Sequence, residues 1–291
     1  MAYRNSFWRR YFGSAAAFLV ALILIYLLNN ANIFHTILAK LSFQTREDIA
    51  VDQSASGEES YYPEIIIPQP QMAGTWIHKP NFLLFYDTDI MQARFTLHKL
   101  EASFTRGDAN RYGIRFNEDE VLETKTAWYS DYSGTGYDRG HLVPAGDFKC
   151  CQTDMVETFS MSNIAPFDSV LNRYAWNELE MKTRSWARRL GTVYVITGPV
   201  FEHRFKYIGR YTEVSVPTHF FKIIFTLSGN TGIPKNIIAF LMPNEPMYKF
   251  TQERSTVNLD KIEQLSGLDF FKMLPDELEN KLEAANQTGG W

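Results

Sequence analysis

Cysteine is nearly absent from this 291-residue chain, which contains two of them, the neighbours Cys150 and Cys151. Neighbouring Cα atoms lie about 3.8 Å apart, shorter than the usual span of a disulfide, so we expect two free thiols. A fold held together by disulfides is therefore excluded. The cysteines and the six histidines also lack the spacing that is typical of a zinc site.

An excess of positive charge is missing as well. The formal net charge is −4, whereas proteins that bind nucleic acid through its phosphates are often basic. Acidic residues gather in 47–59 and 276–283, while basic residues gather in 182–189 and 204–210. A local basic face thus remains compatible with the sequence. Hydrophobic residues make up 45% of the chain, which excludes disorder of its main body.

Long apolar runs are lacking, with one exception near the N-terminus. Three arginines among the first ten residues precede an uncharged stretch, residues 11–28, whose length is close to that of a membrane span. We expect residues 1–10 to be cytoplasmic, residues 11–28 to be an uncleaved transmembrane signal anchor, and the rest to be extracytoplasmic (periplasmic in a bacterium). The membrane would then be one partner of the chain. Secretion after cleavage of a signal peptide is the alternative.

The remainder of the chain predicts a single α+β domain with a mixed sheet. Residues 29–80 indicate a juxtamembrane helix and a linker, residues 81–275 the main domain, and residues 276–291 a polar helix or tail. Runs of β-branched and aromatic residues predict strands, and apolar residues at steps of three and four predict helices. The expected strands are 82–86, 94–99, 193–197, 219–227 and 237–242, and the expected helices are 152–158, 171–190, 259–266 and 275–285.

The segment Asp138-Arg139-Gly140-His141 carries the clearest chemical signal. Hydrolysis of a phosphodiester needs a base that removes a proton from water, and histidine is the side chain whose ordinary pKa lies nearest to neutral pH. The reaction also needs positive charge at the phosphate, which Arg139 and a divalent metal ion could supply. Taken singly, an Asp-Arg pair is usually a surface ion pair and a loop histidine is usually structural.

A second group of polar residues lies on the predicted helix 171–190. Asn172, Trp176 and Glu180 are four residues apart, so they fall within about 80° of one another around a regular helix. Asn172 and Glu180 are therefore expected to face one cavity, with Trp176 packed between them. An asparagine carbonyl is a suitable ligand for Mg²⁺, although an asparagine at a helix start is more often a cap.

These motifs resemble the DNA/RNA non-specific endonuclease family, the family of endonuclease G. The family's Asp-Arg-Gly-His signature matches residues 138–141, its Ser-Asn-Ile segment matches residues 162–164, and its Asn-x-x-Ala-Trp-x-x-Leu-Glu pattern matches residues 172–180. Shorter similar stretches extend the resemblance over roughly residues 80 to 275. The resemblance implies an endonuclease domain at 81–275 with a ββα-metal (His-Me finger) active site. It also implies hydrolysis of DNA and RNA to 5′-phosphate products.

The resemblance also implies the roles of individual residues. His141 would be the general base, and Asn172 would bind Mg²⁺, with Mn²⁺ or another divalent ion as a substitute. Asp138 and Glu180 would orient water molecules or the histidine, Arg139 would contact the phosphate, and Asn163 would support the site by hydrogen bonding. An upstream arginine, either Arg111 or Arg115, and the helix residue Arg173 would contribute to substrate binding.

Two residues depart from the family pattern. Phe167 stands where many relatives have glutamine, and Phe159 stands where some have asparagine, which puts substrate contacts and rate in question. Three alternatives follow: a catalytically silent nucleic-acid-binding relative, a phosphodiesterase on the same scaffold acting on a smaller ester or lipid head group, and a membrane-anchored adaptor. The sequence leaves a homodimer open.

Overall fold

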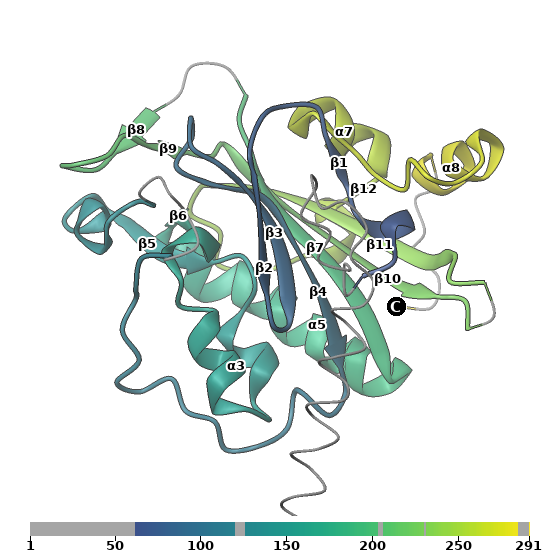
Figure 1. Ribbon diagram of the computed structural model, residues 1–291, viewed down its shortest axis with the longest axis horizontal. Helices are drawn as coiled ribbons and strands as arrows, with labels where there is room; N and C mark the ends of the chain where they lie inside the picture. The colour runs from purple at the N-terminus through teal and green to yellow at the C-terminus, as the bar shows by residue number, and fades with distance from the viewer. Residues whose placement is uncertain (1–61, 120–125, 203–205, 230, 285–290) are drawn as a thin grey trace, which may run out of the picture. The chain divides into compact units, whose positions relative to one another are not determined.

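An antiparallel sheet of seven strands forms the centre of the part of the chain that the computed structural model describes, residues 62–119, 126–202, 206–229, 231–284 and 291 (Figure 1). Every pairing in this sheet is antiparallel, so the predicted mixed sheet is wrong. The strand order is β12 (Thr256–Val257), β11 (Pro234–Pro243), β10 (His219–Leu227), β7 (Thr192–Val200), β4 (Gln92–Glu101), β3 (Phe82–Asp87) and β2 (Thr75–Lys79).

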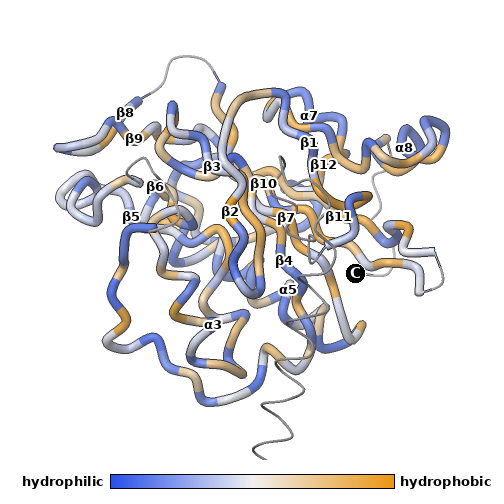
Figure 2. Tube along the Cα trace, in the orientation of Figure 1, coloured by the Kyte–Doolittle hydropathy of each residue, from blue (hydrophilic) through white to orange (hydrophobic). Residues whose placement is uncertain are grey.

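The central strands are apolar on both faces, which Figure 2 shows as orange along β7, β10 and β11. Side chains of a strand alternate between the two faces of a sheet. On β10, Phe220 and Ile224 enter one core cluster, whereas Phe221, Ile223 and Phe225 enter a second cluster. A strand buried on both sides needs a continuous apolar run rather than an alternating pattern.

Helices cover both faces of the sheet. The helix α5 (Asn177–Leu190) packs Leu179 and Trp186 into the first cluster. On the other face, α7 (Leu259–Ser266) and α8 (Asp276–Glu283) contribute Leu259 and Leu282 to the second cluster (Figure 1). The shorter elements are α3 (Gln152–Glu157), α6 (Gln252–Ser255), and the two strand pairs β1 (Gln69–Pro70) with β13 (Leu268–Asp269) and β8 (Lys206–Ile208) with β9 (Val214–Val216).

A two-stranded ribbon followed by a helix forms a ββα unit beside the sheet. The ribbon pairs β5 (Tyr137–His141) with β6 (Ile164–Asp168) in antiparallel register, with His141 opposite Ile164. Asp168 ends β6 and caps the helix, because its Oδ1 accepts hydrogen bonds from the backbone N–H groups of Val170 and Leu171. The helix cap is therefore Asp168 rather than Asn172.

The predicted helix 171–190 begins two residues earlier and is not regular. It consists of α4 (Ser169–Leu171), a π-helical turn, η5 (Asn172–Trp176), and α5. The N–H of Ala175 donates to the carbonyl oxygen of Met247 at 3.3 Å, outside the helix. Diversion of a helical N–H to an outside acceptor accompanies the wider turn.

The folded unit includes residues that the sequence assigned to flanking segments. Ile77 of β2 is fully buried, and Tyr62 and Ile66 belong to the second core cluster, although all three precede residue 81. At the other end, the buried Leu282 joins α8 to the same cluster. The predicted anchor, residues 11–28, lies outside the described residues. Among the residues that are described, no helix combines the length and the apolar character that crossing a membrane requires.

Candidate active site

A cleft of about 400 Å³ lies between the ribbon and the helix of the ββα unit. It brings together seven residues that the sequence singled out from three separate stretches of chain. Five further residues complete the lining. The lining consists of Arg111, Asp138, Arg139, His141, Pro144, Ala145, Gly146, Asn172, Arg173, Asn177, Glu180 and Arg184.

Asp138 organises one side of the cleft. Its carboxylate accepts from the guanidinium of Arg173 at 2.9 Å (Nε to Oδ2) and 2.7 Å (Nη2 to Oδ1), which is a bidentate pair. Its Oδ2 also accepts from Nδ2 of Asn172 at 3.1 Å. Because the amide nitrogen of Asn172 is used in this bond, Oδ1 is the atom left to act as an acceptor.

Arg139 follows Asp138 on β5 and also lines the cleft. Its guanidinium donates to the carbonyl oxygen of Tyr129 at 3.0 Å from Nε and 2.6 Å from Nη2, and to the hydroxyl of Ser133 at 2.8 Å. It also stacks 3.6 Å from the centre of the Tyr129 ring. These contacts hold the cation at the cleft, and no carboxylate of the described residues pairs with it, so its charge can act on an anion.

His141 is packed against aromatic rings. The ring of Phe159 meets it edge-on with centres 4.7 Å apart, and the ring of Phe116 lies at 5.5 Å. Its Nε2 is enclosed and has no hydrogen-bond partner among the residues that the structure describes. Burial, with a smaller effect from the positive charge of Arg111, lowers the pKa of His141 to about 3. The imidazole is thus neutral at pH 7.

The backbone that follows His141 is held by hydrogen bonds to the side chain of Asn163, which is fully buried. Its Oδ1 accepts from the N–H of Val143 at 2.9 Å, and its Nδ2 donates to the carbonyl oxygens of Val143 at 3.0 Å and Thr158 at 2.8 Å. Asn163 therefore fixes the turn after the histidine without lining the cleft.

A buried network of charged groups extends from the cleft into the sheet. Asp147 accepts from Nη1 of Arg184 at 2.8 Å and contacts Nε2 of His98 at 3.0 Å. Nη1 of Arg184 also lies 4.0 Å from Oε2 of Glu180. Burial raises the pKa of Glu180 to about 7, while the charges of Lys222 and Arg184 oppose that rise.

Lys222 places an ammonium group inside this network. It is 1% exposed, its Nζ donates to Oγ1 of Thr197 at 2.6 Å, and it lies 5.0 Å from the centre of the Trp176 ring. Burial lowers its pKa to about 8, against the opposing effect of Glu180 and Asp147. The sequence did not predict this network, because its members come from four elements that lie far apart along the chain.

The upstream arginines and Trp176 differ in their relation to the cleft. Of the two upstream arginines, Arg111 lines the cleft and Arg115 does not. Trp176 is fully buried against the sheet rather than packed between Asn172 and Glu180 at the surface of the cleft. The π-helical turn explains the difference, since five residues instead of four bring Asn177 onto the face of Asn172.

Phe167 and Phe159, the two departures from the family pattern, have different positions. Phe167 is fully buried and stacks on Phe220 with ring centres 3.5 Å apart, so it does not line the cleft. It also explains the glycine of the signature, because a Cβ on Gly140 would lie 2.0 Å from the Phe167 ring. Phe159, in contrast, contacts the ring of His141.

Comparison with known proteins decides the family. The family model described as DNA/RNA non-specific endonuclease matches residues 64–277. The chain belongs to this family. Endonuclease G, mitochondrial, of Bos taurus is 36% identical over 204 residues, which cover 66% of this chain and 67% of that protein. Nuclease C1 of Cunninghamella echinulata is 34% identical over 218 residues, covering 70% of this chain and 86% of that protein.

A solved structure matches the nuclease as well. The crystal structure of an EndoG/EndoGI complex has a TM-score of 0.63 and 30% sequence identity, and the match covers 70% of this chain and 88% of that chain. Family and relatives together show that the protein is a hydrolase, a nuclease of the type that acts on DNA and RNA. The α+β fold with its large antiparallel sheet agrees with this match.

The comparisons also correct the expected location of the nuclease. Relatives such as endonuclease G of Homo sapiens and nuclease EXOG of Danio rerio are named as mitochondrial proteins. The prediction of a membrane-anchored, extracytoplasmic enzyme is therefore wrong. It depended on the composition of residues 11–28 alone, and an arginine-flanked apolar N-terminal segment does not by itself distinguish an anchor from another targeting segment.

The cleft fits the divalent metal on which the family in general depends. Within the described part of the chain, Oδ1 of Asn172 makes no hydrogen bond, and the Glu180 carboxylate has no cation closer than Arg184 at 4.0 Å. Burial raises the pKa of Glu180 to about 7 despite the opposing charges of Lys222 and Arg184, so a further cation beside it would favour the carboxylate form. An amide oxygen and a carboxylate with room for water are donors that a hard cation prefers.

Proposed function

We propose that this nuclease hydrolyses DNA and RNA with little preference for the sugar, depends on Mg²⁺, and leaves 5′-phosphate ends. The observation that supports it best is the shared cleft, which is lined by the imidazole of His141, the amide of Asn172 and the guanidinium of Arg139. A base, a metal ligand and a phosphate-binding cation are the groups that phosphodiester hydrolysis needs.

In the proposed mechanism, the neutral imidazole of His141 accepts a proton from the attacking water. Burial is the main cause of the lowered pKa of His141 and Arg111 the smaller one, so a phosphate in the cleft, whose negative charge opposes Arg111, raises that pKa. Arg139, held on Tyr129, binds a phosphate oxygen. Asp138 keeps Asn172 and Arg173 in place through the three hydrogen bonds that it accepts.

Oδ1 of Asn172 would hold Mg²⁺, with Mn²⁺ as a substitute, and Glu180 would orient water around it. When bound, the ion neutralises charge on the phosphate and on the departing sugar oxygen. Two of the three alternatives, a silent binding protein and an adaptor, would leave the imidazole of His141 and the oxygen of Asn172 in one cleft without a function. The third, a phosphodiesterase that acts on a smaller ester, is tested by the digestion of DNA and RNA. The predicted homodimer stays a prediction, which light scattering of the purified protein tests.

The decisive experiment is digestion of plasmid DNA and of RNA by the purified protein with Mg²⁺ and with EDTA. Both substrates should be degraded with Mg²⁺ and preserved with EDTA, and the products should accept a kinase label only after phosphatase treatment. His141→Ala should lower the rate by about 10²–10⁴-fold. His219→Ala is the matched control, since His219 lies on β10 and does not line the cleft. Near-normal activity of His141→Ala would reject the assigned base.

A further inference from the structure

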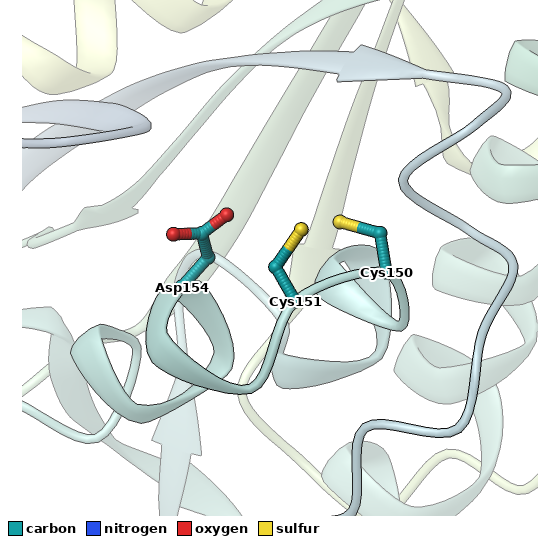
Figure 3. Close-up of side chains that lie close together, drawn as sticks. All are labelled: Cys150, Cys151 and Asp154. Carbon is teal, nitrogen blue, oxygen red and sulfur yellow. The ribbon is translucent and has the colours of Figure 1, made fainter. Parts of the chain in front are cut away.

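Away from the cleft, three metal-ligating side chains converge at the start of α3. The sulfur atoms of Cys150 and Cys151 and a carboxylate oxygen of Asp154 all lie within 4.8 Å of one another (Figure 3). All three residues are partly buried, and both cysteines are free thiols. We propose that this group is a binding site for a thiophilic divalent cation, of which Zn²⁺ is the representative.

The local backbone explains how three donors reach one point. Cys151 is the residue before the first turn of α3, and Asp154 follows three residues later, a spacing that puts both side chains on one side of a helix. Cys150 precedes them, and its sulfur points towards that of Cys151 (Figure 3). Donors around a tetrahedral zinc ion lie about 3.5–3.8 Å apart, so small side-chain rotations suffice to close the site.

The turn that carries the cysteines is already fixed by its neighbours. The N–H of Cys150 donates to the carbonyl oxygen of Phe104 at 3.1 Å, and the N–H of Ala109 donates to that of Lys149 at 3.2 Å. The side-chain amide of Gln152 bonds both the N–H and the carbonyl oxygen of Asn110, at 2.9 and 3.0 Å. A cation would therefore bind to a preformed backbone, which lowers the entropic cost of binding.

The donor set selects the class of metal. Two thiolates and one carboxylate favour zinc and softer ions over Mg²⁺, which prefers oxygen alone. Binding releases the two thiol protons to solvent. The cation then compensates the negative charge of the two thiolates and of the Asp154 carboxylate. Since three donors from the described residues converge, one coordination position remains for water. A disulfide between the same residues would be strained, because their Cα atoms are about 3.8 Å apart.

Cadmium titration of the full-length, reduced, metal-free protein tests this site independently of nuclease activity. Cadmium thiolates absorb in the ultraviolet, and the chain has no sulfhydryl groups other than Cys150 and Cys151. We expect an absorption band that saturates at one equivalent, persists in excess Mg²⁺ and is displaced by Zn²⁺. Saturating Zn²⁺ should also raise the melting temperature, because a ligand that binds only the folded state stabilises it.

Three variants identify the donors, and one serves as a control. Cys150→Ser and Cys151→Ser should abolish the saturable band, and Asp154→Asn should weaken the affinity by at least about tenfold. Asp260→Asn should change nothing, because Asp260 belongs to a separate group of carboxylates with Glu263 and Glu283. Absence of a band in the folded wild-type protein would overturn the proposal. So would an unchanged affinity in Asp154→Asn, which would indicate binding by exposed thiols alone.

Discussion

Asn172 and Asp138 are joined by a hydrogen bond of 3.1 Å that runs from the amide nitrogen Nδ2 to the carboxylate oxygen Oδ2. A carboxylate can only accept, so this bond fixes which end of the amide faces away from Asp138. The oxygen Oδ1 is thereby presented in one orientation. Asp138 is itself held by Arg173 on its other side, so the amide is oriented before any ligand arrives.

The first prediction concerns this oriented oxygen. Asn172→Ala should lower the rate at saturating Mg²⁺ by about 10–100-fold and raise the Mg²⁺ concentration that gives half-maximal activity, because the ligand oxygen is lost. Asp138→Asn should have the same direction of effect, since it weakens the hold on the amide. Asn280→Ala, on the exposed side of α8, is the control. A half-maximal Mg²⁺ concentration that is unchanged in Asn172→Ala would contradict the ligand assignment.

The second prediction concerns pH and His141. An unfolded histidine has a pKa of about 6.5, whereas that of His141 in the fold is about 3. Between these values the unfolded chain binds the additional proton, so stability should fall as the pH drops from 6.5 towards 3. His141→Phe, which fits among Phe116 and Phe159, should remove this part of the pH dependence.

Urea unfolding of both proteins at several pH values measures the effect. Wild type should lose more stability than His141→Phe between pH 7 and 5, and the two curves should run parallel between pH 7.5 and 9, where the histidine is neutral in both states. Equal losses at pH 5 would mean that the histidine is not kept neutral by the fold.

The third prediction concerns the glycine of the signature. A Cβ on Gly140 would lie 2.0 Å from the ring of Phe167, which is itself stacked on Phe220 and cannot move freely. Gly140→Ala should therefore destabilise the protein by about 1–3 kcal/mol through overpacking. Gly229→Ala, where a Cβ meets nothing within 4 Å, should be nearly neutral. Thermal melting compares the stability of the two variants. Equal melting temperatures would contradict the steric argument.

The fourth prediction concerns Lys222 and Glu180, whose charges act on each other inside the network. Lys222→Met should destabilise the fold by about 3 kcal/mol, because it removes a buried cation that compensates the negative charge of Glu180 and Asp147. In that background Glu180→Gln should cost less stability than it does in wild type, since the amide needs no compensating cation. A double-mutant cycle by urea unfolding should give a coupling energy of about 0.5–3 kcal/mol. Additive effects would show that the two groups do not interact.

Most of the regular elements could be predicted from the sequence, because their apolar patterns are strong. The predicted strand 219–227 and helix 259–266 coincide with β10 and α7. Strand β2 could not be predicted: it is an edge strand in which only Ile77 is fully buried, so its sequence carries no alternating pattern. The antiparallel arrangement of the sheet likewise depends on pairings between distant strands, which no local pattern contains.

The site shows the same division. Local motifs singled out His141, Asn172 and Arg139, because each lies in a short signature. The choice of Arg111 over Arg115 needed the fold, since both lie upstream of the signature and no motif distinguishes them. Asn177 could have been found only by knowing that the helix contains a π-helical turn, and that turn depends on an acceptor some seventy residues away, the carbonyl oxygen of Met247.

That one hydrogen bond from Ala175 to Met247 has a mechanical consequence. It helps to set the direction in which the side chains of α5 point relative to the ribbon of β5 and β6. If residues 172–176 formed a regular α-helix instead, Glu180 and Arg184 would be turned by about 100° relative to Asn172. The segment that bears Met247 therefore helps to set which helix side chains face the cleft, although Met247 does not line it.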